Sequence, residues 1–412
     1  MDFDMLGLHP RLVRKLAELG LAAPTPIQAR AIPHAMDGRD VMGLAQTGTG
    51  KTAAFGLPMI DALLKAGTSP AAGTVRGLIL APTRELARQI ADNLGDYAQG
   101  THLGIDLVVG GAGINGQIRR LARGTDLLVA TPGRLIDLLE RRALTLGQTR
   151  YLVLDEADQM LDLGFIHALR RIAPLLPSER QSMLFSATMP KQMAELSRAY
   201  LNDPVRVEVS PSGKVADRID QSLHFVAQPD KPARLIRMLQ AQAGGQTLVF
   251  ARTRHGAERL KRQLAAAGID AGSIHGNKSQ SQRERAIRAF RDGRLQVVVA
   301  TDVAARGIDI PGITHVYNYD LPNVAANYVH RIGRTARAGR AGIAVAFCSA
   351  AEMSELRAIQ KLMKLEIPVA GGSPWAAEDA PATEGRGDSA GRGRQPGGNR
   401  RRARRGGRRK AA

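Results

Sequence analysis

Short apolar runs alternate with longer amphipathic stretches along most of this chain, and this alternation constrains its fold more than any other feature. In the first half, the apolar runs cover residues 41–45, 77–81, 107–110, 127–130, 151–155, 183–186 and 205–209. Runs that are apolar throughout are typical of parallel strands with helices on both faces of the sheet. Helical spacing recurs between them, as in residues 84–98 and 134–142. We therefore expect an open α/β sheet with right-handed crossovers.

A second series of the same kind follows a short break. Residues 210–216, SPSGKVA, combine turn-forming residues with a lysine and are typical of a linker. Helical stretches cover residues 257–267 and 281–291. The sequence predicts two similar α/β domains, residues 1–209 and 217–372, and a tail at residues 373–412; we find no fixed-period repeat between the halves. The apolar runs of the second series cover residues 223–226, 247–251, 272–275, 296–300, 315–318 and 343–347.

The charge balance indicates a polyanionic partner. The 412 residues include 58 Lys and Arg against 38 Asp and Glu, a formal charge of +20. Nucleic acid is the simplest partner, with an anionic membrane as the alternative. Residues 378–412 hold eleven basic and four acidic residues without apolar periodicity. We expect this Arg/Gly-rich tail to be disordered and to bind RNA, although a solvated solubility appendage is the other interpretation.

Several protein classes are excluded at this stage. The single cysteine, Cys348, excludes an intrachain disulfide framework and a cysteine-based zinc site, and suits a reducing cytosol. No run reaches the roughly 18 consecutive apolar residues of a membrane span. The first ten residues, MDFDMLGLHP, lack a signal-peptide pattern. We expect a cytoplasmic protein with no membrane role.

A glycine-rich segment after the first apolar run indicates phosphate binding. Residues 45–52 read AQTGTGKT and precede a helical stretch. Gly48 and Gly50 allow a tight loop whose N–H groups and following helix N-terminus face phosphate oxygens. Lys51 can neutralise the β- and γ-phosphates, and the Thr52 hydroxyl can bind Mg2+. Ala45 stands where the usual pattern has its first glycine; the alternative is a glycine-rich turn without a ligand.

An acidic segment, residues 155–158 (DEAD), follows the apolar run 151–154. Carboxylates at the carboxyl end of a parallel strand lie where ligands bind in such sheets. Asp155 is placed to hold Mg2+, and Glu156 to orient and deprotonate an attacking water. For Asp158 we expect an internal contact. Alone, this cluster could be a solvated helix N-terminus; combined with the phosphate loop, it indicates a site for phosphate and Mg2+.

These and further motifs, in this order, resemble the DEAD-box RNA helicases of helicase superfamily 2. The resemblance covers about residues 3–368, and the segments HGNKSQ and NYDLPNVAANYVHRIGRTARAG look most like the bacterial RhlE-like subgroup. It implies two tandem RecA-like domains and RNA-stimulated ATP hydrolysis coupled to local RNA unwinding or remodelling of RNA–protein complexes. The motifs are residues 24–28 (PTPIQ), 45–52, 82–87 (PTRELA), 110–111, 131–134 (TPGR), 155–158, 186–188 (SAT), 249–250, Gln280 with Arg283, 301–309 and 330–337 (HRIGRTAR).

The resemblance implies a nucleotide site shared by both domains. Gln28 is expected to read the adenine edge, and Phe3 to support that pocket, unless it is an ordinary packing anchor. Leu21 stands where the family often has an aromatic residue. Nucleotide contacts are further expected from Gln46, Thr47, Gly48, Thr49, Gly50, Lys51, Thr52, Gly307 and Asp309.

The resemblance also assigns roles beyond nucleotide binding. Arg334 and Arg337 look like the arginines that reach the γ-phosphate, where a cation stabilises transition-state charge. Ser186 and Thr188 are similar to residues that couple hydrolysis to strand separation. His330 and Arg331 are expected to join the two domains.

The RNA contacts implied by the resemblance are to the backbone. With 4% aromatic residues, base stacking is not favoured, so we expect sequence-independent binding. A DNA helicase or translocase and an ATP-gated RNA clamp or annealing chaperone remain alternatives. Ribosomal particles and an RNA degradation complex are both possible settings, and a monomeric core is expected. The expected RNA-binding residues are Arg84, Gly111, Thr131, Arg134, Arg283 and Thr301.

Overall fold

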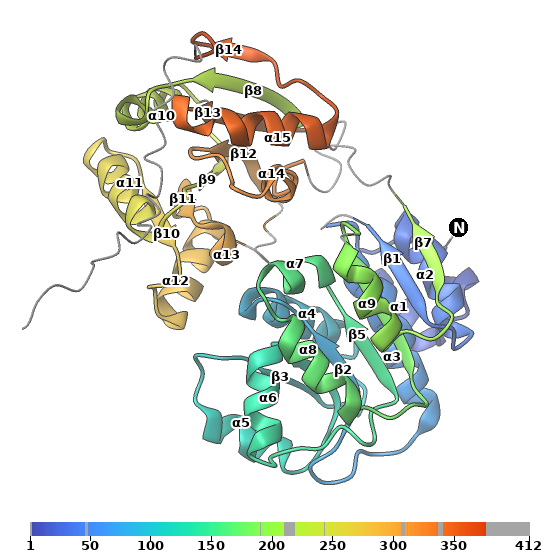
Figure 1. The fold of residues 1–412 in the computed structure, drawn as a ribbon. Coiled ribbons are helices and arrows are strands. Elements are labelled where there is room, and N and C mark those ends of the chain that lie inside the picture. Colours follow the sequence, from blue (N-terminus) through green and yellow to red (C-terminus); the bar gives the residue numbers. More distant parts are fainter. Residues whose placement is uncertain are drawn as a thin grey trace, which may run out of the picture.

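A computed structural model describes residues 2–45, 48–189, 191–209, 219–242, 244–305, 310, 312–336 and 341–375. It contains two seven-stranded sheets, each formed by one half of the chain, and Figure 1 shows them as two lobes. All pairings between named strands are parallel in both sheets. The prediction of two tandem RecA-like α/β domains is confirmed.

The first sheet has the strand order β3-β4-β2-β5-β6-β1-β7. Its inner strands are buried because helices cover both faces. Val153 belongs to the apolar core under α2, α3 and α4, whereas its neighbours Leu152 and Leu154 belong to the core under α6, α8 and α9. The strands are β1 (Val41–Leu44), β2 (Val75–Leu80), β3 (Ile105–Val108), β4 (Thr125–Ala130), β5 (Tyr151–Leu154), β6 (Gln181–Ser186) and β7 (Val205–Glu208).

The second sheet repeats the same arrangement, with the order β10-β11-β9-β12-β13-β8-β14. Position by position, β8 therefore corresponds to β1, and β12 corresponds to β5. The strands are β8 (Ile219–Phe225), β9 (Gln246–Phe250), β10 (Ala271–Ile274), β11 (Val297–Ala300), β12 (Ile313–Asn318), β13 (Gly342–Cys348) and β14 (Val369–Gly371).

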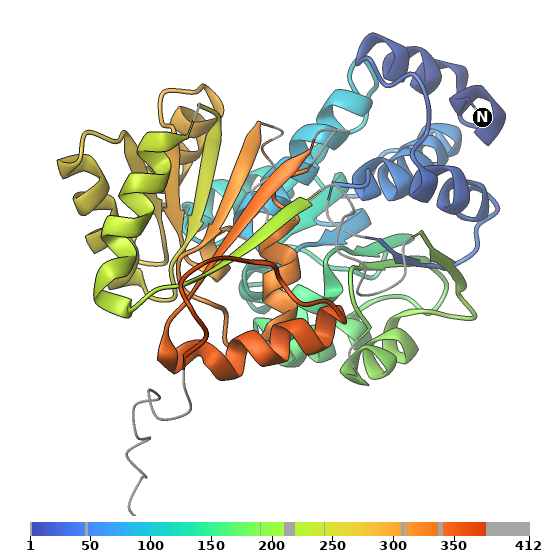
Figure 2. The same cartoon turned by 90° about the horizontal axis from the view of Figure 1, so that it is seen from above.

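Helices connect successive strands in both domains. Figure 2, the view from above, shows helices packed beside the strands of both lobes. No helix of the described residues is long and apolar enough to cross a membrane. The helices of the first domain are α1 (Pro10–Glu18), α2 (Pro26–Met36), α3 (Lys51–Ala66), α4 (Arg84–Tyr97), α5 (Ile114–Leu121), α6 (Pro132–Glu140), α7 (Ala157–Asp162), α8 (Ile166–Ile172) and α9 (Lys191–Tyr200). Those of the second are α10 (Lys231–Ala241), α11 (Arg254–Ala266), α12 (Gln280–Arg291), α13 (Asp302–Ala305), α14 (Ala325–Ile332) and α15 (Met353–Met363).

The predicted strands all occur, with bounds that differ by a few residues. The short strand β14 was not predicted, because its residues are partly or fully exposed and form no apolar run. The predicted linker, residues 210–216, and nearly all of the predicted tail lie outside the described residues. The domain boundaries therefore remain a prediction.

Candidate active site and RNA groove

The phosphate loop joins β1 to α3, so its lysine is the first residue of a helix. Gly48 and Gly50 have φ angles of 84° and 90°, a backbone region that glycine adopts without steric cost. A side chain at Gly50 would also collide with the amide of Gln28. That amide donates from Nε2 to the carbonyl of Gly50 at 3.0 Å, and its Oε1 accepts from the N–H of Thr25 at 2.9 Å. Gln28 is thus bound to the phosphate loop itself.

Lys51 lies at the base of this loop, next to the first carboxylate of the DEAD segment. Its Nζ donates to the carbonyl of Ala45 at 3.3 Å and lies 3.8 Å from Oδ1 of Asp155. Both side chains are buried. Burial raises the pKa of Asp155 to about 6, with Glu156 adding to the rise and Lys51 opposing it. A cation near Asp155 would favour its ionised form.

Glu156 marks the turn from β5 into α7. It adopts a left-handed conformation with φ 51° and ψ 50°, which is unusual for a residue other than glycine. Its N–H donates to Oδ1 of Asp155 at 2.9 Å, so the two carboxylates are oriented by the same turn. Strained backbone of this kind is concentrated at functional sites.

One cavity of about 470 Å3 brings both domains to these residues. Its wall includes Lys51, Asp155 and Glu156 from the first domain, and Arg334 from the second. Arg334 is only 2% exposed and follows α14 in the chain. An arginine of one domain therefore faces the phosphate loop of the other. The wall is formed by Gly48, Gly50, Lys51, Thr52, Ala53, Leu86, Gln89, Asp92, Asn93, Asp96, Tyr97, Asp155, Glu156, Arg291 and Arg334.

The third carboxylate, Asp158, makes the expected internal contact. Its Oδ2 accepts from the N–H of Ala187 at 3.1 Å and from the N–H and Oγ1 of Thr188, both at 2.9 Å. Oγ of Ser186 donates to the carbonyl of Thr188 at 2.7 Å, which closes the turn after β6. Oδ2 of Asp158 also lies 3.9 Å from Nε2 of His330 in the second domain. Asp158 thus links the SAT segment to the domain interface.

A second hollow, of about 520 Å3, gathers most of the expected RNA contacts. Arg84 lies over the backbone of the Gly110–Gly111 turn, where a side chain at Gly111 would collide with its guanidinium. Nη1 of Arg134 donates to the carbonyl of Ala112 at 3.1 Å. The wall is formed by Pro82, Thr83, Arg84, Glu85, Gly110, Thr131, Gly133, Arg134, Leu163, Phe165, Gly276, Lys278 and Arg283.

Direct contacts between α4 and α12 hold the two domains together beside this groove. Nη2 of Arg283 lies 3.0 Å from Oε2 of Glu85, and Nη2 of Arg88 lies 3.2 Å from Oε1 of Glu284. Nη1 of Arg84 also donates to Oε1 of Gln280 at 3.3 Å. The groove and the cavity therefore lie along one interface.

The expectation that Arg331 joins the two domains is wrong for this arrangement. Its guanidinium donates to both carboxylate oxygens of Asp302, at 2.5 and 2.8 Å, and to Oδ1 of Asn318 at 3.1 Å. A further bond, of 2.6 Å, goes to the carbonyl of Asp320. These partners belong to the second domain, where Arg331 anchors α14.

Other expected residues fall outside the cavity wall or outside the described residues. Phe3 is buried in an apolar cluster with Leu8, Leu16 and Leu57, as a packing anchor would be. Thr301 is largely buried, and its N–H donates to the carbonyl of Ile274 at 3.2 Å. Five expected residues lie outside the described parts of the chain: Gln46, Thr47, Gly307, Asp309 and Arg337.

Sequence reasoning missed one wall of the cavity. Gln89, Asp92, Asn93 and Asp96 follow one another at helical spacing along α4, and Tyr97 ends that helix. Their spacing puts them on one face, a signal that is visible in the sequence. Which partner this face meets depends on the packing of α4 beside α3, which no local pattern reveals.

The oxygen donors present fit a magnesium ion. The described residues contain no cluster of three or more His, Cys, Asp or Glu side chains suited to a metal. Asp155 and Thr52, however, line the same cavity, and Mg2+ is usually bound by one or two protein oxygens together with substrate phosphates and water. A two-residue site is therefore sufficient.

Comparisons with known proteins identify the family of the chain. A DEAD/DEAH box helicase family model matches residues 25–196, and a helicase conserved C-terminal domain model matches residues 230–339. The ATP-dependent RNA helicase CshA of Listeria monocytogenes is 41% identical over 373 residues, which cover 90% of this chain and 71% of CshA.

Two solved structures of yeast Dbp5 differ in how well they match. S. cerevisiae Dbp5 bound to RNA and ADP BeF3 matches with a TM-score of 0.80 at 32% identity, over 90% of this chain and 95% of that one. A Dbp5 variant bound to Nup159, Gle1, IP6 and ADP gives 0.60 at 31% identity, over 90% of this chain and 96% of that one. Motifs, fold and relatives agree: the chain belongs to the DEAD-box family of ATP-dependent RNA helicases.

Proposed function

We propose that this chain hydrolyses ATP between its two domains when RNA is bound, and uses the cycle to open short RNA duplexes or remodel RNA–protein complexes. The observation that carries this proposal is the shared cavity, where Lys51 and Glu156 of one domain face Arg334 of the other. Such a site is complete only when the domains are together. Anything that brings them together therefore promotes hydrolysis.

Each of these residues has a role that its position allows. Lys51 and the N–H groups of the loop bind the β- and γ-phosphates. Mg2+, held by Thr52 and Asp155, would neutralise phosphate charge when bound. Glu156 accepts a proton from the attacking water, and Arg334 stabilises the charge that develops on the γ-phosphoryl group. When ATP binds, the amide of Gln28 releases the carbonyl of Gly50 and forms hydrogen bonds with adenine instead.

RNA is the ligand that the second hollow suits. Arg84, Arg134 and Arg283 converge there with the hydroxyl of Thr131 and with backbone at Gly110. Cations, hydroxyls and N–H groups bind phosphates without reading sequence. Because Arg283 comes from the second domain and Arg84 from the first, a strand in this groove contacts both domains.

The domain arrangement supports this cycle. The two Dbp5 comparisons have similar identity and coverage, and we infer that their different TM-scores come from different domain placement. The higher score belongs to the Dbp5 structure with RNA and ADP BeF3. We infer that ATP and RNA together favour the arrangement seen here, and that phosphate release lets the domains separate.

The test is ATP hydrolysis by the full chain without polynucleotide, with single-stranded RNA, and with single-stranded DNA of equal length. We expect strong stimulation by RNA, weak or no stimulation by DNA, and no stimulated activity in Lys51→Ala. Equal stimulation by DNA would favour a DNA helicase or translocase. RNA binding without any ATP hydrolysis would favour a clamp or annealing module.

The setting of this activity is a separate inference. The +20 charge and the basic segment 378–412 suit a large RNA or ribonucleoprotein, such as a ribosomal particle or an RNA degradation complex. We infer a monomeric core that acts in the cytoplasm. Membership of the RhlE-like subgroup remains a prediction. RNAs crosslinked to the chain in cells would identify the physiological target.

A further inference from the structure

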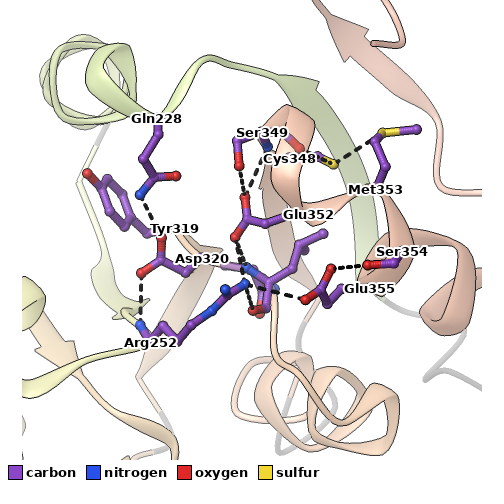
Figure 3. A network of polar contacts seen from close by, with 12 residues as sticks. Gln228, Arg252, Tyr319, Asp320, Cys348, Ser349, Glu352, Met353, Ser354 and Glu355 are labelled. Carbon is purple, nitrogen blue, oxygen red and sulfur yellow. Dashed lines mark hydrogen bonds and ion pairs between the residues drawn. The ribbon is translucent and has the colours of Figure 1, made fainter. Parts of the chain in front are cut away.

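A buried carboxylate of the second domain, Glu352, accepts five hydrogen bonds. Figure 3 shows it between Ser349 and Arg252. Its Oε2 accepts from Nζ of Lys231 at 2.5 Å and from N–H and Oγ of Ser349 at 3.0 and 2.7 Å. Its Oε1 accepts from the N–H of Leu321 at 2.9 Å and from Nη2 of Arg252 at 3.2 Å. This donor set resembles an anion-binding site that is filled by a side chain.

The site is closed on the lysine side and open on the arginine side. Lys231 is fully buried and Glu352 is 3% exposed, whereas the side chain of Arg252 is 37% exposed. A buried ion pair is maintained only if further hydrogen bonds satisfy both partners. Nζ of Lys231 meets this condition through the carbonyl of Tyr319, at 2.8 Å. Arg252 is thus the donor through which we expect a small anion to enter from solvent.

The position of this site in the fold matches that of the phosphate loop. Lys231 begins α10 after β8, as Lys51 begins α3 after β1, and β8 and β1 hold the same place in their sheets. Asp320 follows β12 and lies 3.6 Å from Lys231, as Asp155 follows β5 and lies 3.8 Å from Lys51. The first domain leaves its lysine facing a cavity. The second domain fills the corresponding place with the carboxylate of Glu352.

This carboxylate is connected to α14, the helix that precedes Arg334. Glu352 and Lys231 together hold the segment 319–321, through the N–H of Leu321 and the carbonyl of Tyr319. The carbonyl of Asp320, in the middle of that segment, accepts from Nη1 of Arg331 at 2.6 Å. Arg331 lies in α14, three residues before Arg334. A shift of the segment would therefore move the anchor of α14, the helix that directly precedes Arg334.

We propose that Glu352 is a positioning residue: a resident anion that takes the place of a phosphate in the second domain and fixes, through residues 319–321 and Arg331, the approach of Arg334 to the nucleotide cavity. The inference rests on the proposed role of Arg334. Glu352 does not line that cavity, so it acts on the geometry of catalysis and not on nucleotide contacts.

The experiment is chemical rescue in the full chain. Glu352→Ala removes the carboxylate and one methylene, which together have the size of acetate. We expect kcat of RNA-stimulated hydrolysis to fall about tenfold to a hundredfold, as small displacements of catalytic groups do, while KM for ATP changes little. Sodium acetate should restore part of kcat, and sodium chloride at equal ionic strength should not. Glu352→Asp should retain intermediate activity.

Two further variants separate positioning from stability. Lys231→Met combined with Glu352→Leu replaces the pair by apolar side chains, which is often neutral for folding, and keeps the test valid should Glu352→Ala unfold. We expect this double variant to fold with a lowered kcat that acetate does not restore.

The second variant, Asp126→Ala, removes a buried carboxylate near the N-terminal end of β4 in the first domain. This carboxylate pairs with Arg76 at 2.7 Å. We expect it to lower thermal stability and leave kcat unchanged.

These experiments distinguish failure of the positioning role of Glu352 from failure of the proposed function. If the unmodified chain shows no RNA-stimulated hydrolysis, the proposed function itself is wrong. If the unmodified chain is active and the double variant keeps its kcat, Glu352 has no positioning role. Acetate that raises the melting temperature of Glu352→Ala without raising its kcat would likewise overturn the inference.

Discussion

Nη2 of Arg283 in the second domain lies 3.0 Å from Oε2 of Glu85 in the first, with side chains that are 12% and 5% exposed. The pair is thus largely desolvated, and it orients an arginine that also lines the RNA groove. Removing one partner of a buried pair leaves the other charge uncompensated and costs several kcal/mol. Loss of either partner therefore disfavours the arrangement in which both sites are complete.

Glu85→Gln should weaken this arrangement. We expect the RNA concentration for half-maximal ATPase to rise about tenfold, the equivalent of about 1.4 kcal/mol, with a smaller effect on kcat. Arg88→Ala is the matched control, because its pair with Glu284 is half exposed and such pairs contribute about 0–1 kcal/mol. Tighter RNA binding by Glu85→Gln would mean that the pair competes with RNA.

Glu156→Gln should abolish hydrolysis while the fold is retained. The amide keeps the size of the side chain but cannot accept the proton of the attacking water, and general-base catalysis contributes about 10²–10⁴-fold. Steady-state ATPase with saturating RNA is the measurement. Glu179→Gln changes an exposed carboxylate and should have no effect. Hydrolysis by Glu156→Gln at the parental rate would refute the role of Glu156.

Asp155 gives a pH dependence of stability with a definite sign. Its pKa is raised from 3.8 to about 6 in the folded state, so the folded chain binds this proton more tightly than the unfolded chain. Ionisation of Asp155 therefore lowers the free energy of unfolding as pH rises through that window. Asp155→Asn should lose activity. The difference in the free energy of unfolding between this variant and the parent should shift in favour of the variant by about 1–3 kcal/mol from pH 4 to pH 7.

Thermal melts of both chains without nucleotide or Mg2+, between pH 4 and 7, test this expectation. Because Asp155→Asn also removes the ion-pair partner of Lys51, part of the gain in the free energy of unfolding is lost. Glu258→Gln is a control of opposite sign, because hydrogen bonds from Ser273, His275 and Lys278 lower the pKa of Glu258 to about 2. Its contribution is present above about pH 4.5 and is lost on acidification. An identical pH dependence for Asp155→Asn and the parent would contradict a pKa of Asp155 that is raised by burial in the folded state.

Asp158→Asn should uncouple unwinding from hydrolysis. One oxygen of Asp158 accepts three hydrogen bonds from Ala187 and Thr188, and charge-assisted bonds of this kind contribute about 1.5–3 kcal/mol each. We expect duplex strands separated per ATP consumed to fall several-fold, with ATPase less affected, since Asp158 is not on the cavity wall. Asp203→Asn, at an exposed pair with Arg39, is the control. Proportional losses of both activities would argue against a coupling role.

The two sheets and the phosphate loop could be predicted from the sequence, because both follow from local patterns. A strand, two glycines, Lys51 and Thr52 lie within residues 41–52, so the pattern is visible in one short segment. The same holds for Asp155 and Glu156 at the end of β5. The apolar runs of parallel strands are strong signals because helices bury both faces.

Contacts between distant segments could not be predicted in this way. Arg331 lies in the same motif as His330, yet it pairs with Asp302, which only the packing of α14 against α13 and β12 determines. Glu352 forms a local capping box with Ser349, which the S-x-x-E spacing indicates, but its pairing with Lys231, 121 positions away, is not a local pattern. Their role follows from the equivalence of β8 and β1, which the sheet order reveals.

The most direct test of the whole account is Arg334→Ala. Because Arg334 is supplied by the second domain, its loss should leave ATP binding at the phosphate loop intact, as measured with a fluorescent ATP analogue. RNA-stimulated kcat should fall about 10³-fold or more, as for other arginines that reach a transferred phosphoryl group. Parental kcat in Arg334→Ala would contradict hydrolysis between the domains.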